Sequence, residues 1–109
     1  MMKVKWSPDA KAALDKTCDS IMEMFGIKAK MKFKQEVRRV KDLLKTNPYL
    51  GPVEPLLADL PDNFRSIVVN HLNKIVYYVE DDTIHIADFW DTRKEPTQQA
   101  QQTKDNIES

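Results

Sequence analysis

Two histidines and two cationic residues are the side chains of this 109-residue chain best suited to catalysis. His71 and His85 can change charge near neutral pH, so that one can accept a proton and the other can donate one. In RNA cleavage, the first would take the proton of a 2′-hydroxyl and the second would protonate the leaving oxygen. Arg65 and Lys74 would stabilise the charge of the phosphate. These four residues are the candidate catalytic set of the sequence.

Members of that set also have structural interpretations. His85 stands between Ile84 and Ile86 in a predicted strand, so it faces the opposite side of the sheet from them. His71 falls in a predicted turn, and Arg65 can pair with a carboxylate on the face of the sheet. We therefore assign no catalytic residue among these four.

The composition is typical of one small domain. The only cysteine, Cys18, excludes an internal disulfide, and no apolar run approaches the ~18 residues of a membrane span. The first residues, Met1 to Lys5, lack the apolar core of a signal peptide, so we expect a cytoplasmic protein without a membrane partner. Asp88, Asp91 and Arg93 are predicted to form local ion pairs, because a metal site would need more convergent ligands. We expect no metal and no cofactor.

The charges balance overall but are separated along the sequence. The net charge is zero, whereas residues 28–45 carry eight cations against two carboxylates and residues 54–91 carry eight carboxylates against two cations. A neutral chain has no general attraction for nucleic acid, which requires concentrated positive charge. The cations of residues 28–45 form either a solvated surface or a surface that attracts an acidic partner or the target.

The first half of the sequence predicts a short strand followed by two helices. Residues 3–6 alternate in polarity, and the run Ser7-Pro8-Asp9 is favourable at a helix start. Gly26 is a favourable stop for the first helix, and a second helix is expected from about residue 28 to residue 45. The short connection makes the two an antiparallel helical hairpin. The second helix has an apolar stripe that consists of Phe33, Val37, Val40 and Leu44.

The second half predicts three consecutive antiparallel strands. Residues 51–62 contain three prolines and are expected to form an ordered loop. The strands are expected over residues 63–70, 74–80 and 83–90, with tight turns between them. Residues 97–109 are polar and have little to bury, so we expect a disordered or frayed C-terminal tail. Residues 1–96 then form a single domain.

This order of elements is typical of an α+β fold. An N-terminal strand, an antiparallel helical hairpin and a three-stranded antiparallel meander follow one another, with the helices on one face of the sheet. The first strand must join the sheet beside one of the other three. Of the adjacent residues Phe89 and Trp90, we expect one to be buried and the other to lie on an exposed apolar patch.

Four short segments within residues 3–96 resemble the RelE/ParE toxin superfamily. They are Pro48-Tyr49-Leu50-Gly51, Arg65-Ser66-Ile67-Val68-Val69, Ile75-Val76-Tyr77-Tyr78-Val79 and Trp90-Asp91-Thr92-Arg93. The resemblance implies the fold above and a toxin of a bacterial type II toxin–antitoxin module, also called a plasmid stabilisation system, which causes growth arrest. It further implies a cognate antitoxin as partner, within a homodimer or a toxin–antitoxin hetero-oligomer.

The resemblance leaves two targets open. Members that resemble ParE bind DNA gyrase, whereas members that resemble RelE are ribosome-dependent mRNA endonucleases. We favour a ParE-like gyrase inhibitor, because residues 97–102 lack the tyrosine or histidine typical of the ribonucleases and because the chain is neutral. Expected contacts with the target are Arg65, Arg93 and Trp90. Expected contacts with the antitoxin are Phe33, Val37 and Trp90.

Overall fold

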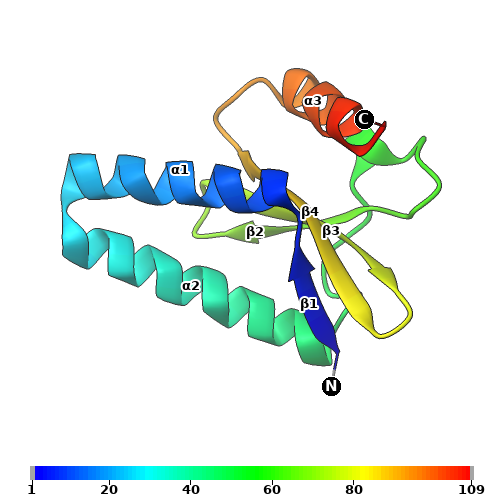
Figure 1. Ribbon diagram of the computed structural model, residues 1–109, viewed down its shortest axis with the longest axis horizontal. Coiled ribbons are helices and arrows are strands. Elements are labelled where there is room, and N and C mark those ends of the chain that lie inside the picture. Colours follow the sequence, from blue (N-terminus) through cyan, green and yellow to red (C-terminus); the bar gives the residue numbers. More distant parts are fainter. Residues whose placement is uncertain (1, 109) are drawn as a thin grey trace.

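The computed structural model describes residues 2–108, which form a four-stranded sheet, two long helices and a C-terminal helix (Figure 1). The elements in chain order are β1 (Lys3–Trp6), α1 (Pro8–Phe25), α2 (Ile27–Thr46), the 3-10 helix η1 (Pro55–Leu57), β2 (Arg65–Val69), β3 (Asn73–Glu80), β4 (Thr83–Asp91) and α3 (Pro96–Glu108). The predicted α+β fold and the order of its six predicted elements, four strands and two helices, are confirmed. Helix α3 and the short η1 are additions to the predicted elements.

The sheet has the strand order β1-β4-β3-β2. Strands β2, β3 and β4 form the antiparallel meander, and β1 runs parallel to β4. The register pairs Lys3 with Thr83 and Trp6 with Ile86. The first strand of the chain thus completes the sheet at the edge opposite β2, and β4 is paired on both sides.

The helical hairpin begins and turns where the sequence predicts. The Ser7 hydroxyl accepts a hydrogen bond from the Ala10 N–H at 3.0 Å and donates one to the Ala87 carbonyl at 2.9 Å. It therefore caps α1 and fixes the start of the helix to β4. Gly26 separates the helices with a φ of +93°, a conformation that glycine adopts without strain.

The hairpin covers one face of the sheet and forms the larger apolar core with it. The predicted stripe of α2 is buried against inward-facing residues of the strands. The buried members of this core are Ala10, Cys18, Phe33, Val37, Val40, Leu44, Val69, Ile75, Tyr77, Ile84, Ile86 and Phe89. The alternation of the strands places every second side chain of β3 in this core and the others on the opposite face.

The opposite face is covered as well, by η1 and α3. A second apolar cluster there has the buried members Leu57, Phe64, Val76, Trp90 and Ala100. Phe89 and Trp90 are both buried, at 5% and 4% exposure, because these neighbours point to opposite covered faces. The expectation that one of the two is exposed is therefore wrong.

The C-terminal segment is a helix, so the prediction of a disordered tail is wrong for residues 97–108. The Glu95 carboxylate accepts hydrogen bonds from the N–H groups of Thr97 and Gln98 at 3.1 and 2.8 Å, which satisfies donors of the first turn of α3. Ala100 and Thr103 are buried against the sheet. A mostly polar segment is ordered here because one narrow side of the helix contacts the folded domain.

Candidate functional site

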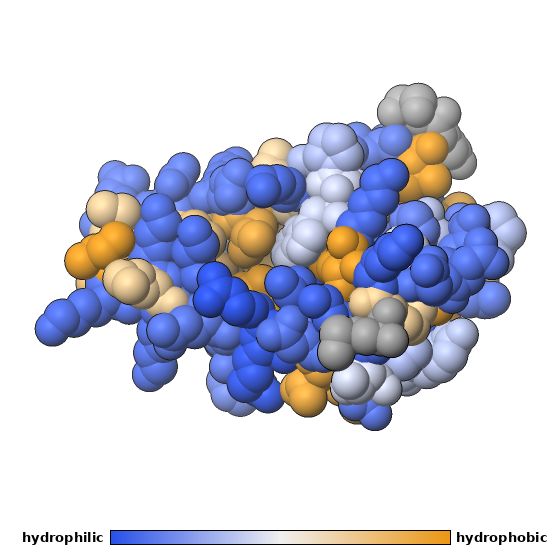
Figure 2. All heavy atoms as spheres, turned by 60° about the horizontal axis from the view of Figure 1, so that its bottom comes forward, coloured by the Kyte–Doolittle hydropathy of each residue, from blue (hydrophilic) through white to orange (hydrophobic). Residues whose placement is uncertain are grey.

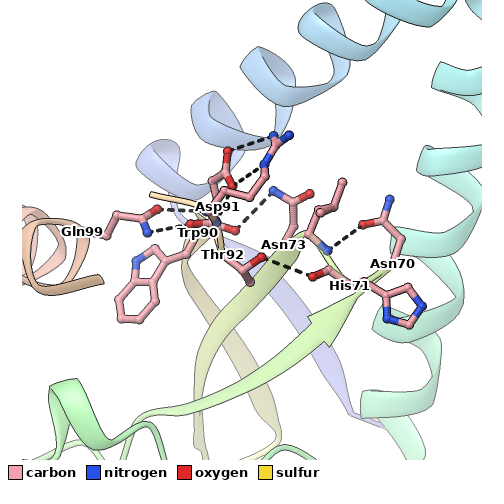
Figure 3. Close-up of polar contacts among 9 residues, drawn as sticks. Asn70, His71, Asn73, Trp90, Asp91, Thr92 and Gln99 are labelled. Atoms are coloured by element: carbon pink, nitrogen blue, oxygen red, sulfur yellow. Dashed lines mark hydrogen bonds and ion pairs between the residues drawn. The ribbon is translucent and has the colours of Figure 1, made fainter. Parts of the chain in front are cut away.

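The structure separates the two histidines of the candidate catalytic set. His71 is exposed in the β2–β3 turn, and its ring points away from Asp91 and Gln99 in Figure 3. His85 lies on β4 and stacks on Tyr78, with 4.8 Å between the ring centroids. His85 pairs across the strands with Tyr78, which lies five residues along β3 from Asn73. Asn73 is the first residue of β3 after the turn that contains His71. At about 3.3 Å per residue, the two histidines are roughly 16 Å or more apart, which is too far for both to act on one bond.

Arg65 and Lys74 point to opposite faces of the sheet. Arg65 is paired across the strands with Tyr77, whose side chain lies in the hairpin core. Tyr77 and Lys74 are three positions apart on β3, so their side chains alternate to opposite sides. The ammonium group of Lys74 lies 3.3 Å from the buried carboxylate of Glu54, on the side of η1. The structure therefore does not bring the four candidate catalytic residues together.

Arg65 is engaged with the segment that follows α2. Its guanidinium donates a hydrogen bond to the Gly51 carbonyl at 2.8 Å, and its central carbon lies 5.1 Å from the centroid of the Tyr49 ring. A cation over an aromatic face is an attractive arrangement. Arg65 thus holds the Tyr49–Gly51 backbone against β2, which is a structural role.

The other expected contact residues differ in their accessibility. Phe33, Val37 and Trp90 are at most 5% exposed, whereas the side chain of Arg93 is 67% exposed. The Arg93 guanidinium pairs with the Asp91 carboxylate at 3.1 Å and lowers the pKa of that carboxyl. Arg93 is the exposed member of the expected contacts. Of the predicted ion-pair set, Asp91 and Arg93 pair with each other, whereas Asp88 accepts hydrogen bonds from the Phe89 N–H and the Thr103 hydroxyl.

A basic pocket of about 310 Å³ opens between α1 and α2. Its apolar lining consists of Trp6, Leu14 and Val37, and its single carboxylate is Asp15. Its cations are Lys11, Lys34, Arg38 and Lys41. Within residues 2–108, none of these four cations forms an ion pair or a side-chain hydrogen bond. Four cations against one carboxylate give the pocket a net charge of +3, so it favours an anionic occupant with an apolar part.

The far end of the hairpin is apolar and exposed. Met24, Phe25, Ile27 and Met31 are 52–69% exposed, and we call these four residues the hairpin end. Figure 2 shows apolar side chains at the left, where the α1–α2 turn lies in Figure 1, next to many hydrophilic ones. A groove of about 530 Å³ continues from Phe25 across Phe33 to Leu72 in the β2–β3 turn. Exposed apolar residues gathered next to a groove are typical of a protein-binding surface.

Residues 2–108 contain neither a metal-binding cluster nor a membrane-spanning helix. No group of three or more histidine, cysteine, aspartate or glutamate side chains is placed to hold a metal ion. No helix of this part of the chain has the length and apolar character needed to cross a membrane.

Comparison with known proteins places this fold in a family. A family model described as the ParE toxin of the type II toxin–antitoxin system parDE matches residues 4–96. The chain belongs to the ParE toxin family. A solved structure described as "Chromosomal ParDE TA system from P. aeruginosa" is similar to this ParE-family chain, with a TM-score of 0.68 and 22% identity over 84% of this chain and 96% of that chain. At this identity the likeness supports the fold alone. No curated protein sequence matches the chain.

The sequence alone indicated only part of the surface of this ParE-family chain. The excess of cations in residues 28–45 was visible, but Trp6 and Lys11 join Arg38 in one pocket only because β1 and α1 both pack beside α2. The apolar residues on both sides of Gly26 were a further signal of the exposed hairpin end. Helix α3 begins at residue 96, where the family match ends.

Proposed function

We propose that this ParE-family chain is a toxin that acts by binding DNA gyrase, with no bond-making chemistry of its own, and that a cognate antitoxin neutralises it. The observation that carries a binding mechanism is the separation of His71 from His85 and of Arg65 from Lys74. General acid–base cleavage requires both proton-transfer groups within hydrogen-bond reach of one substrate. The zero net charge also provides no general attraction for ribosomal RNA.

The target is tested by giving the purified chain both candidate substrates. We expect inhibition of DNA supercoiling by gyrase, and no cleavage of an mRNA translated by ribosomes when its fragments are mapped by primer extension. The opposite pair of results, mRNA cleavage that requires ribosomes and unaffected gyrase, would overturn the gyrase proposal. It would establish the RelE-like endonuclease instead.

For the antitoxin, we propose an acidic amphipathic segment that binds the hairpin. Its carboxylates would pair with the four cations of the basic pocket, and its apolar side chains would contact the pocket lining and the groove at the hairpin end. Val37 borders the pocket and Phe33 borders the groove, although both side chains are at most 5% exposed, so the antitoxin would pack over them rather than around them. Trp90 lines neither hollow.

Reversing single charges on α2 tests this placement. Arg38→Glu changes the pocket, whereas Lys45→Glu makes the same charge change on the same helix outside it, at a lysine that pairs with Asp42. The antitoxin is supplied as the small protein encoded beside the chain, and affinity is measured by calorimetry. We expect roughly tenfold or greater weakening for Arg38→Glu and a much smaller change for Lys45→Glu. Equal changes would place the antitoxin elsewhere on the toxin.

A further inference from the structure

The connection between β3 and β4 is an exposed acidic turn. Glu80 pairs with Thr83 across the strands, so the two residues of the turn are Asp81 and Asp82. Glu80, Asp81 and Asp82 are all exposed, and we call these three residues the acidic turn. Asp82 lies 3.8 Å from the ammonium group of Lys3, whereas Glu80 and Asp81 form no ion pair with any described residue. The acidic turn therefore presents carboxylates that lack a cationic partner.

Strand β1 holds the acidic turn in place. The backbone N–H of Lys3 donates a hydrogen bond to the Asp82 carbonyl at 2.8 Å, and the Thr83 hydroxyl donates one to the Asp82 carboxylate at 3.1 Å. Asp62 adds a further carboxylate nearby, because it lines one hollow together with Val79, the residue before the acidic turn. Carboxylates held in a fixed turn lose little conformational freedom when a partner binds them.

The basic pocket has the opposite charge and lies at the other end of β1. Trp6 at the end of β1 lines the pocket, whereas Lys3 at its start contacts the acidic turn, which is yellow in Figure 1. At about 3.3 Å per residue, the two ends of this strand are roughly 10 Å apart. The pocket has four cations against one carboxylate, net +3, and the acidic turn with Asp62 and Lys3 has four carboxylates against one cation, net −3. The two surfaces are thus neighbours of equal and opposite charge.

Strand β1 also keeps the acidic turn of each chain out of its own basic pocket. The strand is paired with β4 from Lys3 to Trp6, so the spacing between the two surfaces is fixed. The four cations of the pocket accordingly have no carboxylate partner in the part of the chain that the structure describes. An acidic turn that enters the pocket must therefore come from a second copy of the chain.

We propose that two copies of this chain associate with two-fold symmetry, so that the acidic turn of each copy enters the basic pocket of the other. A two-fold interface uses the same patch on both copies, and here one patch contains both the turn and the pocket that receives it. The short spacing along β1 lets a single interface hold both contacts, and association then stops at two copies. Because exposed charges make the contact, the dimer is sensitive to salt.

The dimer has a consequence for the antitoxin. An acidic turn in the pocket pairs with the same four cations that we assign to the carboxylates of the antitoxin. Self-association and antitoxin binding therefore exclude one another, and antitoxin converts the dimer into toxin–antitoxin complexes. This consequence rests on the antitoxin site proposed above, whereas the dimer itself is tested without antitoxin.

Sedimentation equilibrium of the full-length chain measures the association directly. We expect dimers at about 0.01 M salt, where charges act over ~30 Å, and monomers at about 1 M salt, where they act over ~3 Å. The mass should not rise above that of two chains as the protein concentration increases. A parent that stays monomeric at low salt would overturn the proposal and leave the pocket to the antitoxin. Growth beyond two copies would overturn it too, because a reciprocal two-fold contact closes at the dimer.

Charge reversals identify the two surfaces. Arg38→Glu changes the charge of the pocket from +3 to +1, and Glu80→Lys changes that of the turn from −3 to −1. Each change acts twice in a symmetric dimer, so each should weaken association roughly tenfold or more. Lys45→Glu on α2 and Glu23→Lys on α1 make the same charge changes outside both surfaces and should leave association near that of the parent. A dimer unaffected by Arg38→Glu or by Glu80→Lys would contradict the proposed contact.

Mixing the two reversed variants tests whether the contact is reciprocal. In a mixed dimer, the unchanged turn of the Arg38→Glu chain meets the unchanged pocket of the Glu80→Lys chain, so one of the two parental contacts is restored. The mixture should therefore associate more strongly than either variant alone. Circular dichroism and urea unfolding check that both variants are folded. A mixture that associates no better than its separate components would refute the pairing of turn with pocket.

Discussion

The hydroxyl of Tyr77 accepts a hydrogen bond from the backbone N–H of Gly51 at 2.9 Å. Tyr77 is fully buried in the hairpin core, so this contact joins the meander to the segment that follows α2. A Cβ atom at position 51 would lie 2.6 Å from the carbonyl oxygen of Ser66 and 2.9 Å from the Tyr77 hydroxyl. Position 51 therefore requires glycine for reasons of space.

We expect Gly51→Ala to destabilise the protein more than Tyr77→Phe does. The methyl group added by Gly51→Ala would collide with the Ser66 carbonyl, so the backbone would have to move. Tyr77→Phe leaves only the buried N–H of Gly51 without a partner, which costs about 1–3 kcal/mol. The free energy of unfolding is measured in urea. Tyr49→Phe, at an exposed ring, is the matched control and should change stability by less than about 0.5 kcal/mol. Parent-like stability of Gly51→Ala would show that this segment is not held as described.

Stability should also decrease at alkaline pH through Tyr77. Burial raises the pKa of the Tyr77 hydroxyl above its ordinary value of about 10. The fold favours the neutral hydroxyl, so its contribution is fully present below about pH 10 and is lost as the pH rises through the folded-state pKa. Urea unfolding at a series of pH values from about 8 to 11 should show a smaller loss in Tyr77→Phe than in the parent.

Lys74 should prove structural through its contact with Glu54. The Glu54 carboxylate is 1% exposed, accepts a hydrogen bond from the Ser66 hydroxyl at 2.9 Å, and pairs with Lys74 at 3.3 Å. Lys74→Met removes the cation from a buried carboxylate, and we expect a loss of about 1–3 kcal/mol in urea unfolding. Adding Glu54→Gln should recover part of that loss, because a neutral amide needs no counter-charge. Additive effects of the two substitutions would contradict a direct interaction.

Growth arrest should not depend on the histidines. The double substitution His71→Ala, His85→Ala should retain growth arrest, because the two side chains lie too far apart to act on one bond. Arg93→Ala should weaken it, because the exposed guanidinium of Arg93 presents a fixed set of donors. Arg65→Ala should weaken it too, partly by releasing the Tyr49–Gly51 backbone. Levels of folded protein must be matched by circular dichroism. Loss of arrest in the histidine variant, with mRNA cleavage by the parent, would contradict this prediction.

The fold was predictable where the signals are local. Phe33, Val37 and Leu44 recur at helical spacing and are buried as expected, and Gly26 ends α1. The opposite orientations of Arg65 and Lys74 were not predictable, because they depend on the register between β2 and β3. A tight turn predicted from sequence does not fix that register to one residue.

The C-terminal helix was missed because its signals are few. Of its 13 residues, the apolar cluster receives Ala100 alone, so no apolar stripe predicts a helix. The usable signals were at its start, where Pro96 suits the first helical position and the Glu95 carboxylate can accept from the first turn. The expectation that only one of Phe89 and Trp90 is buried was wrong because α3 was not predicted. Trp90 is buried on the face of the sheet that α3 contacts, in the cluster that includes Ala100.

The pairing of β1 with β4 also determines when the protein can fold. Lys3 pairs with Thr83, and the Ser7 hydroxyl binds the Ala87 carbonyl, so each contact spans 80 residues of sequence. A ribosome that adds roughly 5–20 residues per second makes the partner of β1 about 4–16 s after β1 itself. Until then the first strand and the start of α1 have no sheet to join. Acquisition of the native fold is therefore a late event in synthesis, and a nascent chain that stops before β4 remains without its native sheet.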